Sequence, residues 1–254
     1  YPLFTMLGSY RQYRSALFAY QALLHTGPVP EEVTLAAMKL LLGQGLEMAR
    51  LTARYMVHNI FTAANYALFF LARSLPEFRD AAAWEAQSLR NLDTDFDRSF
   101  YADGGHLERN WWYGYYTVKR LTHVWQFARR TGGLRGYEEH FLTGLRRAYR
   151  FYAYTLDGNG LGPSFGDEGG FKNLGFVLDA AVEEGVFPPE TPRDLGVDRS
   201  RSYLMEGAGT AILRTGGGPQ DVYANLSFGE FAGWHSHMDL LSMNVRALGE
   251  VLLE

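Results

Sequence analysis

Three titratable side chains alternate along a short segment near the end of this 254-residue chain. In "HSHMD", His235, His237 and Asp239 are separated by Ser236 and Met238. Because a β-strand turns every second side chain to the same face, the alternation predicts a strand with all three groups on one face, followed on that face by Leu241, Met243 and Val245, which would lead into the core. Imidazole and carboxylate groups at this spacing suit proton transfer or zinc binding. A polar pair that only satisfies its own hydrogen bonds is the alternative.

A second cluster with chemical potential is the aromatic stretch "DGGHLERNWWYGYY" at residues 103–116. Glu108 precedes Tyr113 by five residues, with Trp111 and Trp112 between them. Aromatic residues at the start of a helix usually pack in the core. These point all around the helix, so some of them must be exposed, and exposed aromatic rings suit the apolar faces of sugars.

The third cluster is His58 and Asn59, which begin an otherwise apolar helix in "HNIFTAANYAL". An asparagine near a helix start is usually a capping residue. Taken alone, this pair favours capping over ligand binding.

The elements that would position these clusters are helices first and strands afterwards. Apolar residues recur at three- and four-residue spacing up to about Tyr154, and two-residue spacing with glycine breaks begins near Ser200. The predicted helices are residues 13–25, 31–48, 59–73, 75–98, 111–130, 137–154 and 174–184, and the predicted strand regions are 209–216, 221–230 and 237–254. We therefore predict a mainly α domain over 1–200 and an antiparallel sheet over 201–254.

Bulk composition excludes several classes of protein. The formal net charge of −4 provides no electrostatic footprint for nucleic acid or an anionic membrane. No apolar run is long enough for membrane insertion. The absence of cysteine excludes disulfides, which fits the cytoplasm and is compatible with the periplasm. Because Tyr1 is not a natural start and strand-like residues run to Glu254, we expect a longer natural chain.

In order and spacing, the three clusters resemble the heparinase II/III-like polysaccharide lyases, a group that includes oligoalginate lyases and a uronyl epimerase. Asn59 lies seventeen residues before Pro76 of "LPE". The family's DGG…E…Y and H-x-H-x-D-x-L-S elements are matched by Asp103, Gly104, Gly105, Glu108 and Tyr113, and by His235, His237, Asp239, Leu241 and Ser242. The similarity covers most of the chain.

This resemblance implies an incomplete α/α toroid followed by the start of an antiparallel β-sandwich. It implies cleavage of a uronate-containing polysaccharide by β-elimination. Tyr113 would serve as base and acid, while Asn59 and His235 would neutralise the substrate carboxylate, with His235 also available as a second base.

Around the substrate we place four further side chains, namely Glu108, Trp111, Trp112 and His58. His237 would be a ligand of a structural zinc, whose next ligand, an aspartate eighteen residues later, would be residue 255. An acidic polysaccharide or oligosaccharide is the expected partner, and a homodimer is left open. The expected location is the periplasm or the outside of the cell, with the cytoplasm as the alternative.

The chain departs from the family pattern at two positions. Ile60 occupies the place of the histidine that usually follows Asn59, and Gly114 the place of one that often follows Tyr113. His58 lies on the other side of Asn59, which on a helix is about 200° from position 60.

Three other functions stay open. Paired acids among Asp95, Asp97, Asp103 and Glu108 would suit a glycoside hydrolase, although that hypothesis leaves the histidines unexplained. A uronyl C5-epimerase would use the same proton abstraction. A catalytically inactive polysaccharide-binding protein is the third, and Ile60 favours it.

Overall fold

Helices build the first three quarters of the protein, as a computed structural model shows. The structure describes residues 2–165, 167, 172–173, 175–231, 233, 235 and 241–253. The helices in this part of the chain are α1 (Pro2–Thr26), α2 (Glu31–Leu51), α3 (Asn59–Ser74), α4 (Ala81–Arg98), α5 (Trp111–Arg130), α6 (Glu138–Thr155) and α7 (Phe176–Glu183). None of them is long and apolar enough to cross a membrane.

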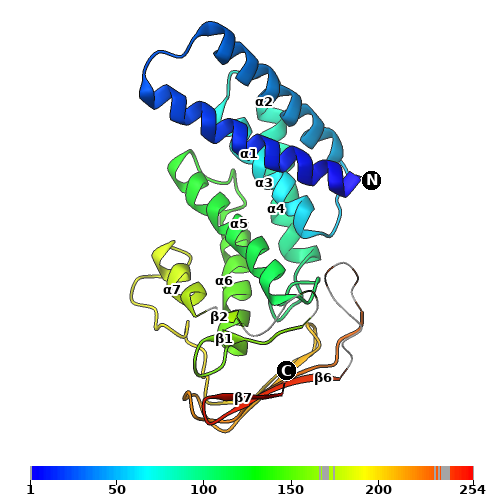
Figure 1. Cartoon of the computed structure of the whole chain (residues 1–254), viewed down its shortest axis with the longest axis vertical. Helices are drawn as coiled ribbons and strands as arrows, with labels where there is room; N and C mark the ends of the chain where they lie inside the picture. The colour runs from blue at the N-terminus through cyan, green and yellow to red at the C-terminus, as the bar shows by residue number, and fades with distance from the viewer. Residues whose placement is uncertain are drawn as a thin grey trace.

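The first six helices form consecutive hairpins in two layers. α3 packs against both α1 and α5, while α2, α4 and α6 form the other layer. The pair α1 and α2 lies at one end of the molecule, and the sheet lies at the other (Figure 1). Asn59 at the start of α3 contacts Glu108 just before α5, and the rings of Phe69 and Phe127 meet further along. α3 and α5 therefore run parallel and begin at the same end.

The five-stranded sheet follows the helices, as the sequence predicted, and the predicted fold class is confirmed. A two-stranded pair, β1 (Leu161–Gly162) and β2 (Lys172–Asn173), precedes an antiparallel sheet in the order β3-β4-β5-β6-β7. The five strands of this sheet are β3 (Tyr203–Met205), β4 (Thr210–Arg214), β5 (Tyr223–Ser227), β6 (Ser242–Ala247) and β7 (Glu250–Leu253). Neighbours in the chain are neighbours in the sheet, and the longest connection, residues 228–241 between β5 and β6, contains His235.

Two helices begin well away from their predicted starts, and one edge strand was missed. α1 begins at Pro2 and not at Tyr13. α4 begins at Ala81 and not at Leu75, because residues 75–80 form turns in which the Leu75 carbonyl accepts the Phe78 N–H. β3 was not predicted at all. It is a three-residue edge strand, too short to show alternation.

The predicted strand face in β6 was also wrong. We expected Leu241, Met243 and Val245 to continue inward from the histidines. Leu241 lies in a turn at φ 61°, and Met243 is 39% exposed. Asn244 and Arg246 are the buried pair. They face inward because their polar groups bond the helical part, Asn244 through the Ser164 N–H and Arg246 through Asp157.

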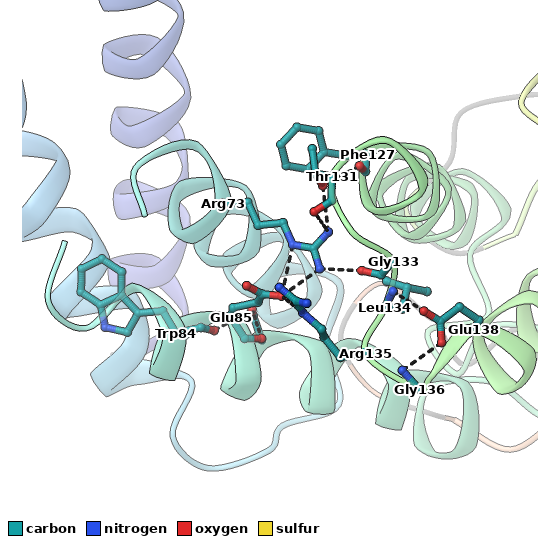
Figure 2. A network of polar contacts seen from close by, with 11 residues as sticks. Arg73, Trp84, Glu85, Phe127, Thr131, Gly133, Leu134, Arg135, Gly136 and Glu138 are labelled. Carbon is teal, nitrogen blue, oxygen red and sulfur yellow. Dashed lines mark hydrogen bonds and ion pairs between the residues drawn. The ribbon is translucent and has the colours of Figure 1, made fainter. Parts of the chain in front are cut away.

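A polar network holds the middle helices together (Figure 2). The Arg73 guanidinium on α3 donates to Glu85 Oε1 on α4, through Nη2 at 2.8 Å and Nε at 3.2 Å. It also donates to Thr131 and to the carbonyl of Gly133 in the loop between α5 and α6. Arg135 from that loop returns to the same Glu85 oxygen at 3.0 Å.

Candidate active site

Glu108 is the centre of a buried polar cluster at the shared end of α3 and α5. It lies in the loop before α5, which is held by the Leu107 N–H bonded to the Ser99 carbonyl and by a β-bridge between Phe100 and His106. The Glu108 side chain is fully buried. Its Oε1 accepts the backbone N–H of Asn59 at 2.7 Å. The first N–H groups of a helix lack partners within the helix, so a carboxylate at this position stabilises the start of α3.

The charge state of Glu108 reflects two opposing effects. Burial raises the pKa of Glu108, whereas the Asn59 N–H and the nearby His235 and Arg120 lower it, and the pKa lies above its usual value. No hydrogen-bond partner for Oε2 occurs among the residues that the structure describes. A buried acceptor in this condition is costly and marks a candidate functional site.

His58 caps α3, whereas we predicted that Asn59 would. Its backbone is extended, and its Nδ1 accepts the N–H of Ile60 at 3.0 Å. His58 is therefore not part of the helix, and the angle of about 200° expected between it and position 60 on a helix does not describe their arrangement. Nδ1 lies 3.6 Å from Glu108 Oε1. Because Nδ1 already accepts the Ile60 N–H, it carries no proton, and its contact with Glu108 is not an ion pair. Burial and the neighbouring His235 lower the pKa of His58 to about 4.

The structure brings Tyr113 and His235 together although they are distant in sequence. Their rings stack with centroids 3.6 Å apart and planes 3° from parallel. Tyr113 is positioned by the start of α5, where Asn110 Oδ1 accepts its N–H at 3.0 Å as the helix cap. The His58 ring centroid is 5.9 Å from that of His235. Tyr113, His235, His58 and Asn59 thus surround Glu108.

Asp167 orients His235 and was not predicted. Its Oδ2 lies 2.8 Å from His235 Nδ1, and its backbone N–H bonds the His235 carbonyl. An ionised carboxylate only accepts, so Nδ1 carries the proton in this pair. The other ring nitrogen, Nε2, points towards Glu108 Oε2 at 4.0 Å. Asp167 belongs to the glycine-rich "FGDEGG" loop, and only its position in the fold connects it to His235.

His235 lies in a turn and not in the predicted strand. β6 begins at Ser242, after the turn at Leu241. His237 and Asp239 lie outside the described residues. Among the described residues, no group of three or more His, Cys, Asp or Glu side chains could hold a metal ion. The zinc role of His237 therefore stays a prediction.

His106 is a further buried histidine of the cluster that sequence reasoning missed. Its Nδ1 lies 3.3 Å from the Glu108 N–H, and burial with the neighbouring histidines lowers the pKa of His106 to about 3. A Cβ at Gly114 would lie 3.0 Å from the His106 Cβ and the Tyr152 hydroxyl. A side chain at position 114 would therefore press on His106 and Tyr152. The available signal for His106 was its place two residues before Glu108.

The two tryptophans have different environments. Trp111 is buried at 5% exposure and stacks on Phe151 at 4.7 Å, so we leave it out of the proposed binding surface. A cavity of about 20 Å³ beside it, lined also by His106 and Thr210, has room for about one water molecule and not for a sugar. Trp112 is half-buried beside Tyr116, with ring centroids 5.1 Å apart.

The carboxylates considered for a hydrolase do not open together onto a cleft. Asp95 is fully buried and accepts from Tyr55, Thr62 and Ser99. Asp97 pairs with His140 at the surface. Asp103 accepts the N–H groups of Gly105 and Ala208.

Comparison with known proteins identifies the family of the chain. The family model described as heparinase II/III N-terminus matches residues 28–178, more than half of the chain. The chain belongs to the heparinase II/III family. No protein with a curated function matches it.

The similar solved structures are larger members of the same fold. A heparinase III from the gene BT4657 with methylated lysines superimposes with a TM-score of 0.66 at 17% identity, covering 87% of this chain and 35% of its own. Another heparinase III gives 0.64 at 18%, covering 84% and 37%. A mutant heparan sulfate lyase HepC from Pedobacter heparinus gives 0.63 at 18%, covering 87% and 36%. The chain thus spans about a third of the length of these heparinase structures.

Proposed function

We propose that this protein is a polysaccharide lyase that cleaves a uronate-containing chain by β-elimination. The single observation that supports it most is the parallel stack of Tyr113 on His235, at 3.6 Å, directly beside the buried Glu108 cluster. Membership of the heparinase II/III family supports the same reaction class.

β-Elimination of a uronate breaks the C5–H and C4–O bonds and forms a C4–C5 double bond. The C5 proton is poorly acidic while the adjacent carboxylate keeps its full charge, so hydrogen-bond donors must stabilise the charge that develops there. The Asn59 side chain and His235 are our candidates for these donors. Because His235 already donates its Nδ1–H to Asp167, it would donate to the substrate through Nε2, and so in its doubly protonated, imidazolium form. Tyr113 would remove the C5 proton as base and return a proton to the departing O4 as acid.

Glu108 and Asp167 would act through these residues and not on the substrate. Glu108 is fully buried and bonds the Asn59 backbone at 2.7 Å. Asp167 bonds His235 Nδ1 and leaves Nε2 to face the cluster. Glu108 and His58, which we predicted to bind substrate, are assigned positioning roles, because Glu108 is fully buried and the Nδ1 of His58 already accepts the Ile60 N–H at the start of α3.

The alternative hydrolase needs two carboxyl groups facing one glycosidic bond. Asp95, Asp97 and Asp103 are each occupied elsewhere, which favours the lyase.

The test is an absorbance assay for unsaturated uronates, with the complete natural chain and a panel of uronate polymers. Tyr113→Phe should lower the rate by about 10²-fold or more, since it removes the acid–base group. Tyr116→Phe, one turn further along α5 and more exposed, is the matched control and should keep its activity. Equal activity of Tyr113→Phe and wild type would reject the mechanism. Deuterium uptake at C5 without cleavage would identify an epimerase, and binding without either reaction a binding protein.

A further inference from the structure

A pocket lined by arginines lies between α6 and β3, apart from the Glu108 cluster. Its volume is about 620 Å³. The lining side chains come from the loop before α5, from α6 and from the edge strand β3, and include Asp103, Arg146, Arg147, Arg150, Tyr154 and Tyr203. Asn59, Glu108, Tyr113 and His235 do not line it. This size is in the range of ligand-binding pockets and exceeds the needs of a single small ion.

The pocket carries more positive charge than its surroundings neutralise. Within the described residues, Arg146, Arg147 and Arg150 form no ion pair. Asp103 is the acidic group on the wall, and its carboxylate is bonded to the N–H groups of Gly105 and Ala208. Three guanidinium groups therefore face one carboxylate that is already occupied.

Hydrogen bonds hold two of these arginines, and the third, which is exposed, lies over an aromatic ring. All three keep most of their donors. Arg146 donates its Nε to the Val186 carbonyl at 2.9 Å, and Arg147 donates to the Phe96 carbonyl. Arg150 lies over the Phe187 ring, 5.6 Å from its centroid. Each guanidinium has five N–H groups, so these contacts leave most donors for a ligand. A held guanidinium also loses less freedom when it binds a planar carboxylate or a sulfate.

Aromatic rings complete the wall. Tyr154 at the end of α6 packs against Tyr203 of β3, with ring centroids 4.5 Å apart. Aromatic faces beside fixed cations suit the ring and the acidic group of a sugar, respectively.

We propose that this pocket is a second, non-catalytic binding site for an acidic saccharide, whose carboxylate or sulfate groups are bound by Arg146, Arg147 and Arg150. The choice of an acidic saccharide rests on the proposed function, whereas the anion site itself rests on the arginines. A nucleic acid would be a competing ligand, which the net charge of −4 disfavours.

The test is calorimetric titration of the complete natural chain with two hexasaccharides, one sulfated and heparin-derived, the other an unsulfated uronate. A Tyr113→Phe background prevents turnover. We expect two binding events for at least one hexasaccharide, and the comparison shows whether sulfate is required. The double variant Arg146→Gln/Arg150→Gln should lose one event or weaken it by about tenfold or more, since charge-assisted hydrogen bonds are lost.

The matched control is Arg129→Gln/Arg130→Gln, which removes the same charge at another pocket, where Glu183 and Glu184 are present. It should keep both events. A single event in the parent, equal weakening in both double variants, or stronger binding of a single-stranded oligonucleotide at the same site would overturn the proposal. An unfolding scan checks that each variant is folded. Cleavage by the Tyr113-containing protein is measured separately, so loss of the second event with cleavage intact rejects only this site.

Discussion

Two glutamates in neighbouring parts of the helical domain, Glu85 partly buried and Glu108 fully buried, have opposite environments. Glu85 receives three hydrogen bonds from Arg73 and Arg135 on one oxygen (Figure 2). From the described residues Glu108 receives one, from the Asn59 N–H, and its second oxygen faces His235 at 4.0 Å. Burial would raise the pKa of Glu85, but the arginines outweigh it and the pKa is lowered, whereas the pKa of Glu108 is raised.

The difference distinguishes a structural polar cluster from a candidate catalytic one. Around Glu85, each charged group has a charged partner, and the result is a fixed contact between α3, α4 and the loop before α6. Beside Glu108, His58 and His106 have lowered pKa values, and among the described residues Glu108 Oε2 has no hydrogen-bond partner. Unsatisfied polar groups cost stability, so a protein retains them where chemistry needs them.

The largest expected effect is on stability at the Arg73 network. Arg73→Ala should lower the free energy of unfolding by about 2–4 kcal/mol, because it removes the mostly buried partner of Glu85 while Arg135 remains. Chemical denaturation would measure it, with activity per folded molecule unchanged. Arg79→Ala, a largely exposed arginine in a weak pair with Asp80, is the control and should change little. Comparable losses in the two variants would contradict a structural role for the network.

At Glu108 the main effect should be on activity instead. Glu108→Gln keeps an acceptor for the Asn59 N–H but changes the group that faces His235, so we expect the cleavage rate to fall about 10–100-fold. Glu85→Gln is the matched control, with lower stability and unchanged turnover. The comparison breaks down if Glu85→Gln reduces turnover as much as Glu108→Gln does.

The two glutamates should also affect the pH dependence of stability with opposite signs. Glu85 has a folded-state pKa below the unfolded value of about 4.3, so its stabilisation is present above that pH and is lost as the pH falls. Glu108 has a raised folded-state pKa, so its ionisation destabilises the fold as the pH rises above about 4.3.

Melting temperatures from pH 3.5 to 8 would test this. Relative to wild type, Glu85→Gln should become less stable with rising pH and Glu108→Gln more stable. Parallel pH profiles for the two variants would refute the assigned shifts.

Much of the fold followed from local patterns in the sequence. Three- and four-residue spacing located the helices because their buried faces are continuous, as in α3, where Phe61, Leu68 and Leu71 are buried. Patterns failed where tertiary contacts set the structure. Alternation predicted a strand through His235, but the turn at Leu241 separates this residue from β6. Likewise, β6 turns Asn244 and Arg246 inward because the helical part supplies their partners.

The candidate site was only partly accessible from sequence. Tyr113, Asn59 and His235 were chosen by residue type and motif order, and the structure brings them around Glu108. His106 and Asp167 lie in segments with no periodic signal. The bridge between Phe100 and His106 places His106 in the cluster, and the hydrogen bonds between Asp167 and His235 place Asp167 there. Burial separated Trp111 from Trp112, since neighbouring positions on a helix point in different directions.

The smallest effect is expected at His140, an exposed counterpart of these clusters. His140 on α6 lies between two carboxylates of α4, with Nδ1 2.8 Å from Asp93 and Nε2 3.1 Å from Asp97. The hydrogen bond to Asp93 raises the pKa of His140. Because the folded-state pKa is raised, the stabilisation is complete below the unfolded value of about 6.5 and is lost as the pH rises through the folded-state pKa.

The His140 side chain is 44% exposed, so solvent and salt screen the pair. His140→Gln should therefore lower the free energy of unfolding at pH 6 by at most about 1 kcal/mol, less at pH 9, and less still in 1 M salt. Denaturation of wild type and variant under these three conditions would measure it. A loss that persists at pH 9 and in 1 M salt would show that His140 acts through packing on Phe96 and not through charge.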